Sequence, residues 1–284
     1  MRTLQKIMHK EVPFFCSLPA LLWQFLFVLA PVSIIIYFSF SSDEWLPSLM
    51  HYATLFQLTY FKIIFRSLMV ATTTAIVCLL LAYPVAYYLA MHVQRAKELL
   101  LFLLTLPFWV NFLVQVYAWF FLLERNGLVN TILLKMRILS EPFLLSNSMF
   151  AIFLVMIYCY LPFMIMPLYS ILEKIDHRLL EASGDLGASA WQTFWRITVP
   201  LSWPGIRTGF LLVLIPAFGE FVIPSLLGGA KYLLVGSLIS YLFLVARNNS
   251  LGAAFTCLSG LVLIGAMLFT YRVRKTIKRV RRGI

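Results

Sequence analysis

The sequence predicts an all-α protein that crosses a membrane several times. Of its 284 residues, 62% are hydrophobic and only 12% are charged, against about 45–50% and about 25% in soluble domains. The hydrophobic residues gather in long runs, and a helix needs about 20 apolar residues to cross the hydrocarbon core of a bilayer. We therefore exclude a soluble protein and expect a single domain, residues 1–284, with six transmembrane helices.

The first expected span covers residues 18–40 and follows the basic residues Arg2, Lys6 and Lys10. As a helix it would extend about 34 Å, which is too long for the apolar part of a signal peptide, so we expect a retained span. A shorter apolar run at residues 232–245 is expected to form an interfacial or re-entrant outer helix. The other five expected spans lie at about 68–91, 99–123, 149–172, 206–227 and 251–271.

The basic residues predict which side of the membrane each loop faces. The formal net charge is +12, and seven of the 23 Lys and Arg residues lie in the last thirteen positions, directly after an apolar span. Cytoplasmic flanks carry such an excess because they face anionic lipid. We therefore expect both termini to be cytoplasmic and no nucleic acid to be bound. The orientation depends strongly on this basic tail.

A polar stretch between the fourth and fifth spans predicts two short helices joined by a tight turn. Asp176 can cap the first helix, and Gly187 can end it, because glycine adopts positive φ without strain. Ser189 and Gln192 form a capping box at the start of the second helix, and Pro200 is expected to stop that helix. Neither helix is long enough to be stable alone in water, so each must pack on a neighbour.

Five residues of this stretch match the E-A-A-x3-G-x9-I-x-L-P loop of the permease subunits of ABC-type importers, and on this loop the chain resembles that family: Glu181, Ala182, Gly187, Ile197 and Pro200. Ser183 and Val199 replace the second Ala and the Leu. The resemblance implies a type I ABC importer permease fold, in which residues 176–200 form the cytoplasmic coupling loop that docks in a cleft of the ATP-hydrolysing subunit. A membrane protein with an unrelated amphipathic hairpin is the alternative.

Two further stretches resemble the polyamine branch of this family, whose importers take up spermidine and putrescine. The run FGEFVIPSLLGGAK, residues 218–231, follows the branch's fifth-span pattern F-G-x-F-V-x-P-x-L-L-G-G-x-K. Residues 106–130 resemble the branch's third span and the loop after it. Gln115 stands where many relatives carry Arg, so no role is carried over to it. The residues of this second stretch that match are Pro107, Phe108, Trp109, Tyr117, Ala118, Trp119, Gly127 and Asn130.

Glu220 is the carboxylate that falls well inside a predicted span, out of eleven in the chain. A charge at mid-bilayer costs at least ~2.5–3.5 kcal/mol on insertion scales, so this side chain should face the protein interior. It could contact a cationic substrate. It could equally be a protonated or Arg-paired carboxyl that holds helices together, and the sequence leaves both hypotheses open.

A path for a flexible polycation needs acidic groups and aromatic faces, which stabilise ammonium groups by ~0.5–2 kcal/mol each. The deeper candidates are Glu220, Trp109 and Tyr117. Asp43, Glu44 and Trp45 are candidates at the outer mouth. This mouth cluster could instead be a docking surface for a binding protein or part of an interfacial aromatic belt.

The sequence offers no metal site and no nucleotide site. The four Cys and four His residues are scattered without ligand spacing, so we expect no metal and no cofactor. There is no G-x-x-x-x-G-K-[ST] phosphate loop, and no nucleophile stands beside a base. We therefore expect a non-catalytic permease subunit whose partner binds ATP and Mg²⁺.

The family resemblance implies residence in the bacterial inner membrane and a set of partners. These are the lipid bilayer, a dimer of ATP-binding subunits, a second homologous permease subunit and an extracytoplasmic substrate-binding protein. The alternative cargo is another small solute, an anion or a metal complex. A buried Arg or several helix N-termini in the path would favour an anion, and no Lys or Arg lies deep in the expected spans. An ion-coupled carrier would show inverted repeats and need no coupling loop. A membrane enzyme would need a catalytic cluster at one interface.

Overall fold

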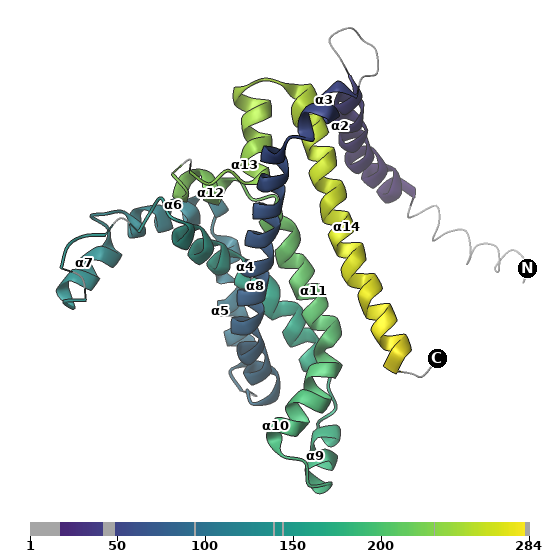
Figure 1. Ribbon diagram of the computed structural model, residues 1–284. Coiled ribbons are helices and arrows are strands. Elements are labelled where there is room, and N and C mark those ends of the chain that lie inside the picture. The colour runs from purple at the N-terminus through teal and green to yellow at the C-terminus, as the bar shows by residue number, and fades with distance from the viewer. Residues whose placement is uncertain are drawn as a thin grey trace, which may run out of the picture. The chain divides into compact units, whose positions relative to one another are not determined.

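The all-α prediction is confirmed by the computed structural model (Figure 1). It describes residues 18–41, 49–93, 95–138, 140–143, 145–229 and 231–281, with side chains to residue 268, and every regular element in these ranges is a helix. The chain divides into two compact units. Unit 1 comprises residues 1–61 and 241–284, and unit 2 comprises residues 62–240.

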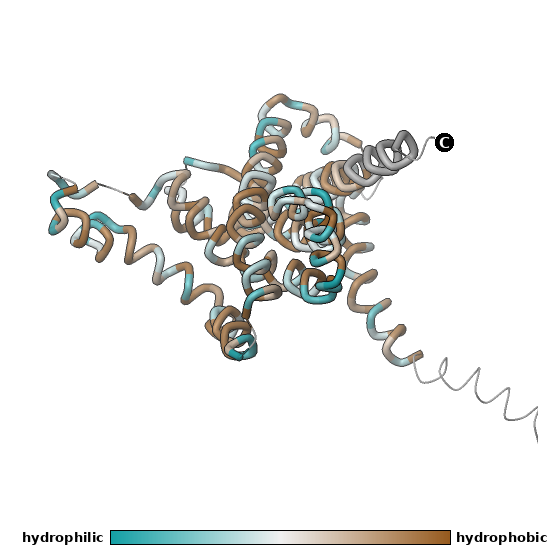
Figure 2. The backbone as a smooth tube through the Cα atoms, turned by 90° about the horizontal axis from the view of Figure 1, so that it is seen from below, coloured by the Kyte–Doolittle hydropathy of each residue, from teal (hydrophilic) through white to brown (hydrophobic). Residues whose placement is uncertain are grey.

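Several helices are long and apolar enough to cross a membrane, and Figure 2 shows apolar residues running along them. Between Lys97 and Lys135, two further helices meet at an angle of 88° and count as a sixth span if they are taken together. The expectation of six membrane-crossing segments is met on that count. The five unbroken helices are Leu18–Phe40, Leu58–Met91, Met149–Leu172, Ala190–Phe218 and Asn249–Leu268.

Unit 1 is built from helices at the two ends of the chain. α14 packs along α2 and α3. The hydroxyl of Tyr52 donates a hydrogen bond to Ser39 Oγ at 3.0 Å, which ties α3 to α2. The elements are the π-helical turn η1 (Phe25–Leu29), α2 (Ala30–Phe40), α3 (Met50–Leu55), the π-helical turn η3 (Tyr241–Val245) and α14 (Asn249–Arg281).

Unit 2 contains the remaining helices, and α8 and α11 form its centre. Gly205 and Gly209 of α11 are four residues apart and face α8, where an added Cβ would lie 2.8 Å from the Pro167 carbonyl oxygen or 2.7 Å from Met164 Sδ. Small residues at this spacing let two helices approach closely in a membrane. The elements are α4 (Leu58–Met91), α5 (Lys97–Trp109), α6 (Phe112–Leu123), α7 (Leu128–Lys135), α8 (Met149–Leu172), α9 (His177–Asp185), α10 (Ala190–Thr193), the π-helical turn η2 (Phe194–Thr198), α11 (Val199–Phe218), α12 (Val222–Leu227) and α13 (Val235–Ser240).

The segment expected as a straight third span, residues 99–123, is broken in the structure. α5 ends at Trp109, Val110 is extended, and α6 begins at Phe112. Asn111 caps the new helix, because its side chain accepts a hydrogen bond from the Leu113 N–H at 2.9 Å. A capping residue inside an apolar run thus lets the chain turn and start a second helix.

The expected fifth span, residues 206–227, is also two helices. α11 begins earlier, at Val199, and ends at Phe218, and α12 starts at Val222. Glu220 therefore lies in a break between helices and not within one. The backbone of α13 passes close to this break: a Cβ on Gly236 would lie 2.1 Å from the Gly219 carbonyl oxygen.

The second expected span and the short apolar run at residues 232–245 are both helical, with bounds that differ from those expected. α4 begins ten residues before the expected start at residue 68. The short run expected at residues 232–245 is helical over Val235–Val245. The Val235 N–H at the start of α13 donates to Ser67 Oγ of α4 at 2.8 Å. A side chain that is distant in sequence thus accepts the hydrogen bond of an N–H that has no partner within its own helix.

Candidate functional site

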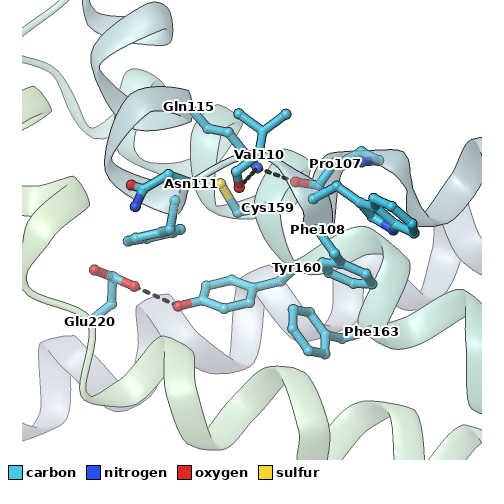
Figure 3. A pocket seen from close by; sticks show the side chains of 11 residues that line it. Pro107, Phe108, Val110, Asn111, Gln115, Cys159, Tyr160, Phe163 and Glu220 are labelled. Atoms are coloured by element: carbon cyan, nitrogen blue, oxygen red, sulfur yellow. Dashed lines mark hydrogen bonds between the residues drawn. The ribbon is translucent and has the colours of Figure 1, made fainter.

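A cavity of about 660 Å³ opens in unit 2 where two of its apolar segments are interrupted (Figure 3). The bend between α5 and α6 forms one wall, α8 forms the second, and the break between α11 and α12 supplies Glu220. The lining residues are Pro107, Phe108, Trp109, Val110, Asn111, Phe112, Gln115, Cys159, Tyr160, Phe163 and Glu220.

Glu220 is the carboxylate of this cavity, and only 8% of the residue is exposed. Its Oε1 accepts hydrogen bonds from the N–H groups of Val222 at 2.9 Å and Ile223 at 3.4 Å, which begin α12. Its Oε2 accepts from the Tyr160 hydroxyl at 2.6 Å, as Figure 3 shows. Because a carboxylate oxygen carries two lone pairs, Oε2 keeps one acceptor position for a further donor.

The wall opposite Glu220 is held in its bent form by Gln115. Its Nε2 donates to the carbonyl oxygens of Pro107 and Val110, the latter at 3.0 Å. Both carbonyls lie at the bend, where the regular helical hydrogen-bond pattern is interrupted; the Pro107 carbonyl also accepts from the Val110 N–H at 3.3 Å. Lipid offers no donor to a carbonyl at such a break. Gln115, in α6, therefore stabilises the bend by supplying hydrogen-bond donors that water would supply in a soluble protein.

Aromatic rings form most of the remaining lining. The rings of Phe108 and Phe163 lie 4.7 Å apart, and those of Tyr160 and Phe163 lie 6.3 Å apart. Trp109 is 77% exposed at the end of α5. No Lys, Arg or His is among the lining residues. One carboxylate among aromatic faces, with no basic side chain among the described residues that line the cavity, is a favourable environment for an ammonium group.

The structure brings together some of the predicted path residues and not others. Glu220 and Trp109 line the same cavity. Tyr117 lies on α6, half-exposed, and is not among the lining residues. The three residues expected at the outer mouth lie outside the described residues: Asp43, Glu44 and Trp45.

The predicted hairpin is formed by α9 and α10, which lie at the opposite end of α11 from α12 (Figure 1). Asp176 caps α9 by accepting from the Arg178 N–H at 3.0 Å. Gly187 ends α9 with φ of +80°, and the N–H groups of Gly187 and Ala188 bond back to Gly184 and Ser183. Both reciprocal bonds of the predicted capping box at the start of α10 are also present.

The expectation that Pro200 stops the second helix is wrong. Helix runs without interruption from Ala190 to Phe218. A π-helical turn, η2, precedes Pro200, and within it the Val199 N–H bonds to the carbonyl of Phe194. This wider turn lets the helix continue past Pro200, which has no N–H to donate to the preceding turn.

The hairpin has a packed face and an exposed face. Phe194 packs against the rings of Tyr83 and Tyr87 on α4, at 5.5 and 5.8 Å. Three large apolar residues of the hairpin and of η2 directly after it are exposed: Leu186 is 88% exposed, Trp191 70% and Trp195 52%. Of the motif residues, Glu181, Ala182, Gly187 and Pro200 are exposed and Ile197 is half-buried.

The caps and the Phe194 contacts fix the hairpin, and its exposed aromatic residues are typical of interfaces. Among the residues that the structure describes, no cluster of three or more His, Cys, Asp or Glu side chains could hold a metal ion.

Comparison with known proteins gives consistent results over nearly the whole chain. A family model described as "binding-protein-dependent transport system inner membrane component" matches residues 82–279. The spermidine/putrescine transport system permease protein PotB of Haemophilus influenzae is 41% identical over 90% of this chain and 92% of its own length. PotB of Escherichia coli K12 is also 41% identical, over 88% and 92%. The inner membrane ABC transporter permease protein YdcU of Escherichia coli is 32% identical, over 94% and 87%.

Solved structures show the same fold. A bacterial ABC transporter that imports the acidic polysaccharide alginate superposes with a TM-score of 0.71 at 20% identity, covering 97% of this chain and 99% of that one. A bacterial alginate ABC transporter in complex with a periplasmic protein superposes with a TM-score of 0.68. At this identity the likeness concerns the fold and not the cargo.

Proposed function

Since this chain belongs to the family of binding-protein-dependent transport system inner membrane components, we propose that it is the permease subunit of an ATP-driven importer of spermidine and putrescine. Relatives named for this transport match it at 41–42% identity over about 90% of its length. The chain is a multi-pass inner-membrane protein, and its cargo crosses through the bundle that these helices form with a second permease subunit.

The observation that carries the choice of cargo is the cavity around Glu220. It offers a carboxylate oxygen with an open acceptor position, aromatic rings and no basic side chain. An ammonium group can donate to that oxygen and lie against a ring face. An anionic cargo would be repelled by the same carboxylate, so the cavity favours a polycation over an anion.

The hairpin supplies the connection to the energy source. We expect its exposed face, with Leu186, Trp191 and Trp195, to dock on a dimer of ATP-binding subunits. Those partners hold ATP and Mg²⁺, and this chain takes no part in the hydrolysis itself. A substrate-binding protein delivers polyamine from the outside. The solved alginate transporter in complex with a periplasmic protein supports this last partnership.

The orientation that follows has both termini and the hairpin in the cytoplasm. In a background without Cys16, Cys78, Cys159 and Cys257, a cysteine placed at Ser189 should react with a membrane-impermeant thiol reagent only after the cells are opened. A cysteine at Ser140, an exposed position between α7 and α8, should react in intact spheroplasts. Reaction of both from the outside would contradict the proposed topology.

The function itself is tested by transport. The chain should be co-expressed with its ATP-binding, second permease and binding-protein partners in cells without other polyamine importers, and uptake of labelled spermidine measured. We expect energy-dependent uptake that excess putrescine inhibits and sulfate does not. Energy-dependent uptake of sulfate or of a metal complex, with none of spermidine, would contradict the proposal.

A further inference from the structure

Helix α5 has an unusual position in unit 2. None of its residues is buried, so the hydrophobic core does not fix it in place. It is nevertheless the helix that carries Phe108 and Trp109 to the cavity. Its ion-pair and ring contacts to α8 lie near its two ends.

The first residue of α5 is tied to the end of α8. Lys97 Nζ lies 2.6 Å from Glu173 Oε1 and 5.3 Å from the centre of the Tyr169 ring. Glu173 directly follows α8, and Asp176, which caps α9 of the hairpin, is three residues further on. The hydrogen bond from Lys97 lowers the pKa of Glu173, so this carboxyl stays charged at neutral pH.

The last turn of α5 is attached to the same helix by an aromatic contact. Phe108 lies against Phe163 of α8, with ring centres 4.7 Å apart. The α5–α6 bend then continues through Val110, whose carbonyl is held by Gln115. α5 is thus attached at one end beside the hairpin and at the other end beside Glu220.

There is also room for the tied end to move. A hollow of about 590 Å³ adjoins the Lys97–Glu173 pair, and its lining includes His177, the first residue of α9. A helix transmits displacement along its axis because its backbone hydrogen bonds keep it stiff, and the 13 residues of α5 extend about 20 Å.

We propose that Lys97 and Glu173 are positioning residues that couple the hairpin to the cavity. When the hairpin is displaced by its ATP-binding partner, the ion pair moves α5 with it, and α5 moves the wall formed by Phe108 and Trp109 relative to Glu220. This inference rests on the proposed function. The Lys97–Glu173 ion pair and the Phe108–Phe163 contact would connect the docking surface to the substrate path, and each contact can be changed by mutation separately.

The test is a charge exchange in the complete transporter, reconstituted in liposomes with loaded binding protein. Lys97→Glu and Glu173→Lys should each lower the spermidine transported per ATP hydrolysed by about five- to tenfold, and the double exchange should restore it to within about twofold of wild type. Exposed ion pairs contribute little to stability, so the amount of assembled complex should be unchanged in all three variants.

A neutral double-mutant cycle provides an independent measurement. Lys97→Met, Glu173→Gln and the double variant should lower the spermidine transported per ATP hydrolysed by the same factor, because removing either partner already removes the ion pair. Arg95→Glu, a charge reversal at an exposed position two residues before Lys97, is the matched control and should transport normally.

The outcomes separate this inference from the proposed function. If the wild-type complex transports no spermidine, the proposed function fails. If wild type transports spermidine, but the single reversals are as well coupled as wild type or the losses in the neutral cycle simply add, Lys97 and Glu173 do not act together and the inference is overturned.

Discussion

Glu220→Gln is expected to lower spermidine uptake roughly ten- to a hundredfold without lowering the amount of protein in the membrane. The substitution keeps the shape of the side chain and removes its charge. The loss of one charged contact to an ammonium group typically costs ~1.5–3 kcal/mol, which corresponds to that range. Uptake of labelled spermidine and immunoblotting of the membrane fraction measure the two quantities.

The protein should remain folded because a glutamine can make the same structural bonds. Its amide oxygen can accept from the N–H groups of Val222 and Ile223, and its amide nitrogen can donate to the Tyr160 hydroxyl. Glu124→Gln removes an exposed carboxylate from the end of α6 and serves as the matched control. Normal uptake by Glu220→Gln would mean that this carboxyl only caps α12 and holds Tyr160.

Gly187→Val is expected to uncouple the transporter. Gly187 has φ of +80° at the turn between α9 and α10, and a left-handed conformation costs a residue with a Cβ about 1–2 kcal/mol, more if it is β-branched. The correctly formed hairpin should become about five- to thirtyfold less populated. Co-purification of the ATP-binding subunit and spermidine uptake should fall together, while the chain still inserts.

Gly184→Val is the control for this substitution. Gly184 lies in α9, three residues before the turn, and a Cβ there meets no atom within 4 Å, just as at Gly187. The two variants add the same side chain to the same exposed hairpin and differ in the φ angle that the backbone requires. Equal association of both variants with the ATP-binding subunit would show that this turn is not needed for docking.

The hairpin was predictable from the sequence because its determinants are local. Asp176, Gly187 and the Ser189–Gln192 box each act on backbone groups within five positions along the chain. The prediction failed at Pro200, where the structure inserts a π-helical turn and continues the helix. Proline rules assume regular α-helical bonding before the proline, and the sequence gives no sign of the wider turn.

The cavity was only partly predictable. Burial of Glu220 followed from the cost of a charge in an apolar segment. Its partner Tyr160 is 60 positions away on α8, and no local pattern connects two residues at that distance. The helix breaks that form the cavity were not predictable from hydrophobicity, because an apolar run has the same length and composition whether its helix is straight or broken. Asn111, an amide in an apolar run, was the local signal for one of them.

The role of Gln115 was also not predictable from the sequence. The family resemblance carries no role over to Gln115, because many relatives have Arg at this position; in the structure its side chain donates to the carbonyl groups of Pro107 and Val110. Both carbonyls lie at the bend, so the role of Gln115 can be seen only once the bend is known.

Comparing spermidine uptake in Glu220→Asp and Glu220→Gln at equal protein level shows whether the charge of Glu220 meets the ammonium groups of the cargo. Aspartate keeps the charge and can still accept from the N–H groups of α12, but it is too short to keep the Tyr160 bond unchanged. We predict substantial uptake by the Asp variant and loss of uptake in the Gln variant. Uptake retained by Gln and lost in Asp would contradict this, because it would show that the bond to Tyr160 matters and the charge does not.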